Sequence, residues 1–434
     1  MKIEKQNSEV PNPLKRKSFW ENLKDAIKGT EADYTTISIR KAIFLLAIPM
    51  ILELVMESTF AVVDIYFVGK LGASAIATVG LTETYLFILY SVAMGLSMAV
   101  TAIIARRTGE KNTSESGNAA VQSIALGLLA ALPLTIGGIF FSKELLSFMG
   151  ADAWSINEGY KYTQYMLGGN AVIVLIFVIN AIFRGAGDAA IAMRVLWIAN
   201  IINICLDPLL IFGWGFVPAF GIEGAAMATN IGRGTGVILQ LWLLFKGVKH
   251  IQVTISQIYI DSKIMLNIVK TSLGGIGQMF IAMTSWIFLI RILAELGSET
   301  VAGSTIAIRI MMFTMMPAWG LSNAAATLVG QNLGAGEPDR AEQSVWKIGF
   351  YNMIFLVLVS VVYFFYNEEL MQLFTDDARV IAVGAEWIQI VSYGYFIYGW
   401  WMVSVQAFNG SGDTTTPTKI NVVFFWLFQI PLAY

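Results

Sequence analysis

The chain carries a long series of apolar stretches, and each stretch is long enough to cross a lipid bilayer. About 20 apolar residues in helical conformation span the hydrocarbon core. Helices are the expected form of each crossing, because unpaired backbone groups are costly in lipid. Only 13% of the residues are charged, against roughly 25% in an ordinary soluble domain. The sequence therefore predicts an all-α polytopic membrane protein.

The order of polar and apolar stretches predicts a tail, two lobes and a linker. Residues 1–41 form a polar tail, with a short amphipathic helix expected over Ser18–Lys28. The longest polar interval inside the apolar region, 247–263, separates an N-terminal lobe of six helices, 42–246, from a C-terminal lobe, 264–434. Eleven crossings are expected, at about 42–68, 74–105, 117–141, 160–183, 190–213, 221–246, 268–293, 301–331, 345–366, 380–407 and 418–434.

The same pattern gives two expectations about completeness and orientation. Duplication of an even-numbered unit requires a twelfth crossing, so we expect the sequence to stop before a last helix. Lys and Arg are more numerous in the connections after even-numbered crossings than after odd-numbered ones, and positive residues are retained on the cytoplasmic side. The tail and the linker are therefore predicted to be cytoplasmic, in a protein of the cell (inner) membrane.

An internal duplication is visible as three landmarks that recur at one spacing. Each lies 225 positions from its counterpart: Leu71-Gly72 and Leu296-Gly297, Gly109 and Gly334, and Phe183–Asp188 and Phe408–Asp413. A unit of six crossings is even, so both halves enter the membrane in the same direction, as a parallel repeat. We expect two six-helix bundles around a central cleft, with Asp188 and Asp413 capping the helices that follow them.

The first crossing contains three acids in a segment that must span lipid. At roughly 100° per residue, Glu53, Glu57 and Asp64 lie within about 40° of one another on the helix. Ionisable residues inside a membrane are functional candidates by default. Two alternatives remain: Asp64 reaches the headgroups, or Glu53 and Glu57 pair with basic residues. Glu83 in the second crossing is a further candidate for the same polar interior.

The fifth and sixth crossings add polar side chains. Asn203 and Asp207 lie one helical turn apart, directly before Pro208, and Thr229 precedes Arg233 by one turn. Carboxylate, amide and hydroxyl oxygens together suit a hard cation such as Na⁺, or exchange for a proton.

Several classes of function are disfavoured. The chain has one His and one Cys, so no cluster with transition-metal spacing is present in the sequence. A net charge of −2 favours no nucleic-acid role. There is no phosphate-binding loop for an ATP-driven pump, and no nucleophile and base at matching depth. We expect a transporter without a cofactor, not an enzyme; a channel fits the two-lobe duplication less well.

Several stretches resemble the multidrug and toxic compound extrusion (MATE) family. They are Val63–Gly69, Phe183–Asp188 with its repeat, Asp207–Gly213, Gly224–Thr229 and, most specifically, Met316–Gly336. The resemblance implies twelve helices in two lobes and export of organic cations coupled to inward Na⁺ or H⁺ movement. Carried over by position, the family's cation site is Asp64, Asn203, Asp207 and Thr229.

The chain departs from that family pattern in two places. Glu57 stands where the family more often has Gln, so Glu53, Glu57 and Glu83 are added as candidate coupling or substrate acids. The seventh crossing, Ser272–Ile290, contains no acid, whereas the NorM-like branch places a Glu there. The chain therefore looks closer to the DinF-like branch.

These observations together predict a monomeric antiporter that exports organic cations or amphipathic small molecules. The first crossing's acids have Gln278, Ala282 and Leu289 at the 225-residue offset, so ion coupling is expected in the N-terminal lobe. The alternative is a lipid or lipid-linked oligosaccharide flippase, which needs several basic residues in its cavity. Candidate cavity residues are Gln278, Met279, Met283, Trp286, Met311 and Met315, of which the methionines offer an adaptable wall.

Overall fold

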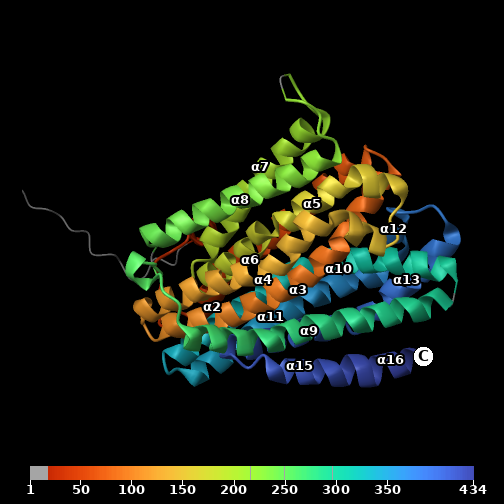
Figure 1. Ribbon diagram of the computed structural model, residues 1–434. Coiled ribbons are helices and arrows are strands. Elements are labelled where there is room, and N and C mark those ends of the chain that lie inside the picture. The colour runs from red at the N-terminus through yellow and green to blue at the C-terminus, as the bar shows by residue number, and fades with distance from the viewer. Residues whose placement is uncertain (1–17, 216, 249, 296) are drawn as a thin grey trace, which may run out of the picture.

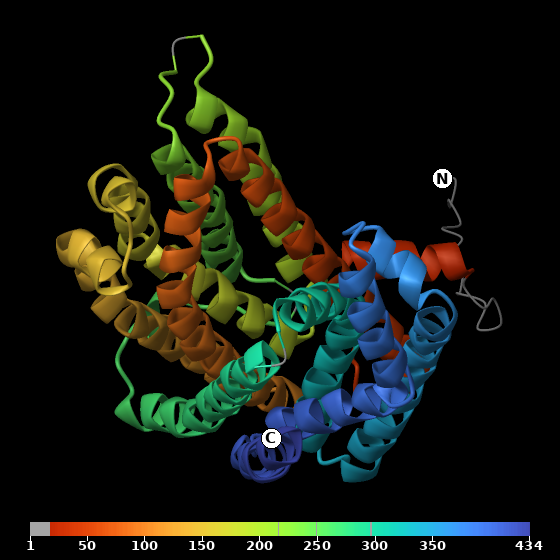
Figure 2. The same cartoon turned by 90° about the vertical axis from the view of Figure 1, so that its right-hand side faces the viewer.

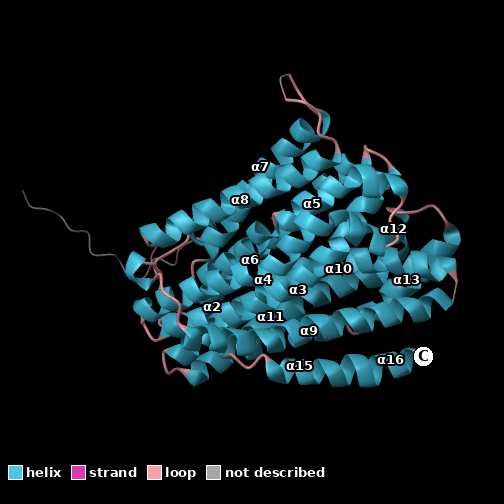
Figure 3. Ribbon diagram, in the orientation of Figure 1, coloured by secondary structure: helices cyan, strands magenta, loops and turns pink. Residues whose placement is uncertain are grey.

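The computed structural model describes residues 18–434 apart from 216, 249 and 296. Within that part the chain is helical and contains no strand (Figure 3). The tail residues 1–17 lie outside the described residues. The amphipathic helix predicted over Ser18–Lys28 is α1, Phe19–Lys28. Ser18 and Glu21 form a reciprocal capping box at its start, which satisfies two backbone donors that the first turn leaves without helical partners.

All eleven expected crossings coincide with helices that run side by side (Figure 1). Three crossings are split into consecutive elements: α5 with α6, α13 with α14, and α15 with a π-helical turn and α16. The bounds are α2 Ile39–Gly69, α3 Ala73–Gly109, α4 Thr113–Phe148, α5 Tyr160–Gly168, α6 Asn170–Ala186, α7 Ala189–Phe212, α8 Ile222–Lys246, α9 Ser262–Glu295, α10 Ser298–Gly334, α11 Pro338–Phe365, α13 Ala378–Ser392 and α14 Tyr395–Ser411, followed by α15 Thr415–Asn421, the π-helical turn Val422–Gln429 and α16 Ile430–Ala433. Short elements lie at Ser155–Gly159, Ile255–Gln257 and α12 Asn367–Gln372.

Seven helical segments among the described residues are long and apolar enough to cross a membrane, and the bent pair α13–α14 would make an eighth. The last crossing, α15 to α16, lies outside that set, as do α2 and α8. The helices α2 and α8 are 31 and 25 residues long, which corresponds to about 46 and 37 Å. They also carry the first crossing's acids and Arg233.

The predicted parallel repeat is present in three dimensions. α2 and α9 are related by the 225-residue offset, as are α3 and α10. Gly95 on α3 lies against Ile276 on α9, and Gly320 on α10 lies against Ile51 on α2. Each of these four residues is 225 positions from its counterpart. Each lobe therefore contacts the other through equivalent residues, which confirms that the two lobes share one fold and one orientation.

Two helix breaks extend the repeat beyond the landmarks read from sequence. The break between α5 and α6 falls at Gly169, and the break between α13 and α14 includes Gly394, which is 225 positions later. The second pair is bent by 61°. Of the two predicted caps, Asp413 accepts hydrogen bonds from the backbone of Thr415 and Thr416 at 3.2 and 3.0 Å. Asp188 holds the N-cap position of α7, but its side chain makes no capping bond.

The lobes pack on each other near the end of the bundle that carries the connection 247–261, here called the linker end. The helices of the first half gather on one side of Figure 2 and most of those of the second half on the other. A hydrophobic cluster joins them, with Leu46 and Met50 of α2 packed with Ala325 and Leu328 of α10. Separate clusters fill each lobe.

Glycines allow α3 and α10 to meet closely at the linker end. A Cβ at Gly109 would collide with the carbonyl of Gln331, and a Cβ at Gly334 would collide with that of Arg106. These two contacts are also related by the 225-residue offset. Gln331 donates a hydrogen bond to the carbonyl oxygen of Gly185 at 2.9 Å. Backbone thus contacts backbone across the lobe boundary, as small residues permit in membrane bundles.

The segment between α1 and α2 crosses the same end and contacts both lobes. The guanidinium of Arg340, on α11, donates to the carbonyl oxygens of Tyr34 and Ile37. Asp33 pairs with Lys111 of the first lobe at 3.5 Å. Tyr34 is buried. This segment therefore lies as a strap over the junction between the lobes.

Candidate ion-coupling site

Three helices of the first lobe, α2, α7 and α8, supply the predicted cation ligands. α7 and α8 approach closely because α8 presents glycines to its neighbour. A Cβ at Gly232 would lie 2.7 Å from the carbonyl oxygen of Ala199 and 3.0 Å from Cβ of Asn203. This approach brings Asn203 to Thr229, where the amide donates to the hydroxyl oxygen at 3.2 Å.

The oxygens at this site are buried and lack donors. Asp207 is fully buried. Among the described residues, neither of its carboxylate oxygens has a hydrogen-bond partner, nor do Oδ1 of Asp64 and Oδ1 of Asn203. Asp64 lies on α2 and Asp207 on α7, and these two helices pack against each other. Buried polar groups are normally hydrogen-bonded, so this set of acceptors suits a cation or a proton that would complete it.

Glu57 is held from two directions. Nη2 of Arg233 donates to Oε1 of Glu57 at 2.6 Å, and the amide of Asn200 donates to Oε2 at 3.1 Å. The side chain of Arg233 is 4% exposed, whereas that of Glu57 is 30% exposed. Both carboxylate oxygens of Glu57 are therefore bound, one by α8 and one by α7.

Glu53 lies in a second buried network, closer to the linker end. Nη1 of Arg184 and the amide of Asn180 each donate to Oε1 of Glu53 at 3.1 Å. Gln240 donates in turn to Asn180. Glu53 and Glu57 thus follow the alternative in which they pair with basic residues. Glu83, on α3, is exposed and lies within electrostatic range of Asp64.

The candidate cavity residues of the second half differ from one another in their surroundings. Gln278 is buried, and its amide donates to Oδ1 of Asn409 at 2.9 Å and to the carbonyl oxygen of Thr414 at 3.0 Å, so it is used inside its own lobe. Met283 reaches the other lobe, with its sulfur 3.8 Å from the hydroxyl of Ser91. The remaining candidates are partly buried: Met279, Trp286, Met311 and Met315.

An aromatic stack in the second lobe was not predicted from sequence. The rings of Tyr363 and Tyr395 stack with centroids 5.6 Å apart, Tyr398 stacks on Tyr395 at 6.4 Å, and Trp401 follows at 4.8 Å. The hydroxyl of Thr314 lies within hydrogen-bond distance of both Tyr363 and Tyr395. The spacing of Tyr395, Tyr398 and Trp401 at three-residue intervals is the signal that could have indicated one aromatic helix face.

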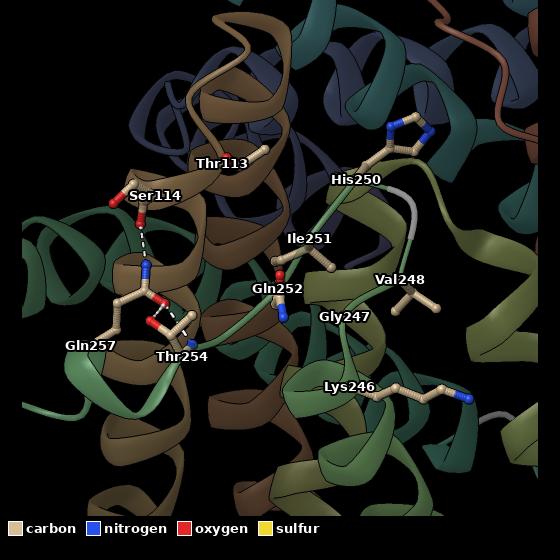
Figure 4. A pocket seen from close by; sticks show the side chains of 10 residues that line it. All are labelled: Thr113, Ser114, Lys246, Gly247, Val248, His250, Ile251, Gln252, Thr254 and Gln257. Atoms are coloured by element: carbon tan, nitrogen blue, oxygen red, sulfur yellow. Dashed lines mark hydrogen bonds between the residues drawn. The ribbon is translucent and has the colours of Figure 1, made fainter.

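A separate cavity of about 440 Å³ lies at the linker end (Figure 4). The linker itself forms one wall, and Gln257 donates to the carbonyl oxygen of Ser114 at 2.9 Å. The lining contains basic and neutral residues but no acid: Thr113, Ser114, Lys246, Gly247, Val248, His250, Ile251, Gln252, Thr254 and Gln257. It therefore offers no carboxylate for a coupling ion.

The family model MatE matches residues 49–209 and 275–434, one match in each half. The chain belongs to the MatE family. Members of this family are transporters, so this protein is a multi-pass membrane transporter and not an enzyme, as predicted. The two matched ranges repeat the duplication seen in the sequence and in the fold.

Relatives and solved structures agree with this assignment over most of the chain. The probable multidrug resistance protein NorM of Thermotoga maritima is 27% identical over 91% of this chain and 85% of its own. The FAD transporter of Shewanella oneidensis is 26% identical over 91% and 87%. A MATE transporter in complex with MaD5 is similar in fold, with a TM-score of 0.84 and 23% identity over 93% of this chain and 90% of that one.

Proposed function

We propose that this MatE transporter exports organic cations or amphipathic small molecules in exchange for Na⁺ or H⁺. The coupling ion is held by Asp64, Asn203, Asp207 and Thr229. The observation that carries the proposal is the group of buried carboxylate oxygens of Asp64 and Asp207 that no described donor meets. A cation or a proton stabilises such a pair of acids by removing its negative charge.

The charges near the site favour a cationic substrate. Glu83 is exposed and Glu57 is partly exposed, whereas Arg184 and Arg233 are each bound to a glutamate. One relative is named for an anion, FAD, and a flippase for pyrophosphate-linked lipids would also need free basic side chains. The paired state of both arginines supports a cation in preference to either. Met279, Met283, Trp286, Met311 and Met315 supply an adaptable apolar wall for it.

The proposed orientation in the membrane implies that this conformation is closed on the cytoplasmic side. With the basic connections in the cytoplasm, the linker end faces the cytoplasm and the contacts between the lobes close that side. Alternating access then requires the α3–α10 contact and the strap to separate so that the site opens inward. We place the protein in the cell membrane, as a monomer, in the DinF-like branch.

Ethidium efflux by Asp64→Asn and Asp207→Asn variants tests the proposed site. Each neutral amide removes one charge that the ion would balance, so we expect coupled efflux to fall by about tenfold or more in both variants. Glu144→Gln is the matched control, because Glu144 is an exposed carboxylate on α4, and its efflux should stay at the wild-type level. Undiminished efflux in both aspartate variants would sink the proposal.

A further inference from the structure

A positive charge is built into the candidate ion site. Arg233 lies one helical turn after Thr229 on α8, and its guanidinium carbon is 5.2 Å from the ring centre of Phe60. Its side chain is almost fully buried. An arginine stays protonated in proteins and presents five donors. A charge of this kind must have a carboxylate partner at every stage of the transport cycle, because an unpaired buried ion is strongly destabilising.

Two acids are available to that charge. Glu57 holds it now, through the 2.6 Å bond to Nη2. Asp64 lies one helical turn after Phe60 on α2, and the guanidinium lies over the ring of Phe60, so the charge of Arg233 lies between Glu57 and Asp64 along that helix. Nε of Arg233 and Oδ1 of Asp64 are buried and have no hydrogen-bond partner among the described residues. Donor capacity on Arg233 and acceptor capacity on Asp64 therefore lie in the same cluster.

We propose that Arg233 is a tethered cation that competes with the coupling ion for Asp64, and that Glu57 is the positioning residue that holds it away. This rests on the proposed function, since it assumes that Asp64 binds the ion. While Glu57 holds the guanidinium, Asp64 and Asp207 are available to the ion. When the ion pair between Glu57 and Arg233 breaks, the guanidinium moves to Asp64 and displaces the ion.

The same exchange lets the organic cation displace the ion although the two bind at different carboxylates. Glu57 is 30% exposed, so the positive group of a substrate can approach its carboxylate. A substrate bound there competes with Arg233 for Glu57, releases the guanidinium to Asp64 and expels the ion. Ion binding has the reverse effect, because coupling between two ligands is reciprocal. Binding of Na⁺ or H⁺ then promotes release of the substrate.

A double-mutant cycle tests this exchange in proteoliposomes that contain the full chain. Ethidium transport is driven by an imposed Na⁺ gradient and, separately, by an imposed proton gradient, and the ion concentration for half-maximal rate is measured. We expect Glu57→Gln to raise that concentration by about tenfold or more in the arm that drives the wild type. Adding Arg233→Met to Glu57→Gln removes the competitor, so the half-maximal ion concentration should return to within about threefold of wild type. The maximal rate should stay low in both variants, because the substrate loses the carboxylate of Glu57.

A charge-retaining variant separates competition from simple loss of structure. Glu57→Gln with Arg233→Lys keeps a tethered positive charge, so its ion requirement should stay as high as that of Glu57→Gln alone. If the pair is only a structural brace, Glu57→Gln/Arg233→Met is as impaired as the single variant or more so, and that result overturns the inference. Elution as a single species from a sizing column checks folding of every variant.

The controls distinguish this inference from the proposed function. If the wild type couples to an ion and Asp64→Asn abolishes coupling, but the double variant does not recover, only the role of Arg233 is wrong. If Asp64→Asn leaves coupling intact, the proposed site is wrong and the inference falls with it. If neither gradient drives the wild type, antiport itself is contradicted, and so is the exchange.

Discussion

A methyl group added at Gly109 or at Gly334 should weaken the contact that closes the linker end. A Cβ at Gly109 would lie 2.8 Å from the carbonyl carbon of Gln331, and a Cβ at Gly334 would lie 3.0 Å from that of Arg106. Ordinary contacts of a Cβ begin at 3.4 Å. Both neighbouring atoms belong to backbone, which cannot rotate away as a side chain can. α3 and α10 must therefore move apart.

The expected size of the effect follows from that geometry. Forcing an extra methyl into a tightly packed contact costs about 1–3 kcal/mol. If only the state closed at the linker end carries this cost, the ratio of closed to open molecules falls by about 5- to 150-fold. Gly80→Ala is the matched control, because Gly80 lies on the same helix α3 and a Cβ there meets nothing within 4 Å.

Distances between spin labels measure this ratio directly. Labels at Glu115 of the first half and Glu342 of the second half, on a Cys205→Ser background, report the separation of the lobes at the linker end. We expect Gly109→Ala and Gly334→Ala to shift the distance distribution towards longer values, and Gly80→Ala to leave it unchanged. The reasoning fails if all three variants give the distribution of the parent protein.

Two further predictions concern the same end of the molecule. Arg340→Ala removes the donors that hold the carbonyl oxygens of Tyr34 and Ile37, so the melting temperature in detergent should fall by an amount equivalent to about 1.5–3 kcal/mol; an unchanged melting temperature would show that the strap is not held by Arg340. Asp413 caps α15, and its hydrogen bonds, first with Thr416 and then with Thr415, hold the pKa of its carboxyl below the usual range. Because the folded-state pKa is depressed, the stabilisation is present above the ordinary pKa of about 3.9 and is lost as the pH falls through the lower, folded-state value. Asp413→Asn keeps a capping oxygen but removes the negative charge near the helix N-terminus, so it should lose about 0.3–1 kcal/mol of stability at pH 7 and show a weaker acid dependence. Parallel pH–stability curves for variant and wild type would contradict this.

The scaffold could be predicted because its signals are local or periodic. Apolar length defines the crossings, and repeated glycines mark positions where the backbone must turn or approach closely. The constant 225-residue offset therefore predicted the parallel repeat, which the paired contacts of Gly95 and Gly320 confirm. The breaks at Gly169 and near Gly394 were missed because neither crossing has a proline there, and glycine alone is a weak signal for a break in a membrane helix.

The site could be predicted only as far as a single helix allows. Helical spacing placed Glu53, Glu57 and Asp64 on one stripe, and it cannot say which side chains of other helices meet that stripe. Arg184 and Arg233 come from α6 and α8, and their pairing depends on how those helices pack. For this reason the three acids have different surroundings: Glu53 and Glu57 are in ion pairs, whereas Asp64 forms no ion pair within the part of the chain that the structure describes. Glu53 and Asp64 each keep one buried oxygen without a hydrogen-bond partner among those residues.

The aromatic stack in the second lobe also depends on a contact between helices that the sequence does not predict. Tyr395, Tyr398 and Trp401 share a helix face that the sequence spacing could have indicated. Tyr363 joins them from α11, and nothing in the order of residues links those two helices. The sequence therefore predicts which residues share a helix face, and only the packing of the helices shows which residues of other helices contact that face.

The central claim is that the acids of the first lobe couple an ion gradient to substrate export. It is tested most directly by ethidium transport in proteoliposomes of the wild-type protein under separately imposed Na⁺ and proton gradients, with Asp64→Asn and Asp207→Asn measured alongside. We predict that at least one gradient drives transport by the wild type and that neither variant responds to it. Equal transport with and without both gradients, or an undiminished response in both variants, would contradict the account.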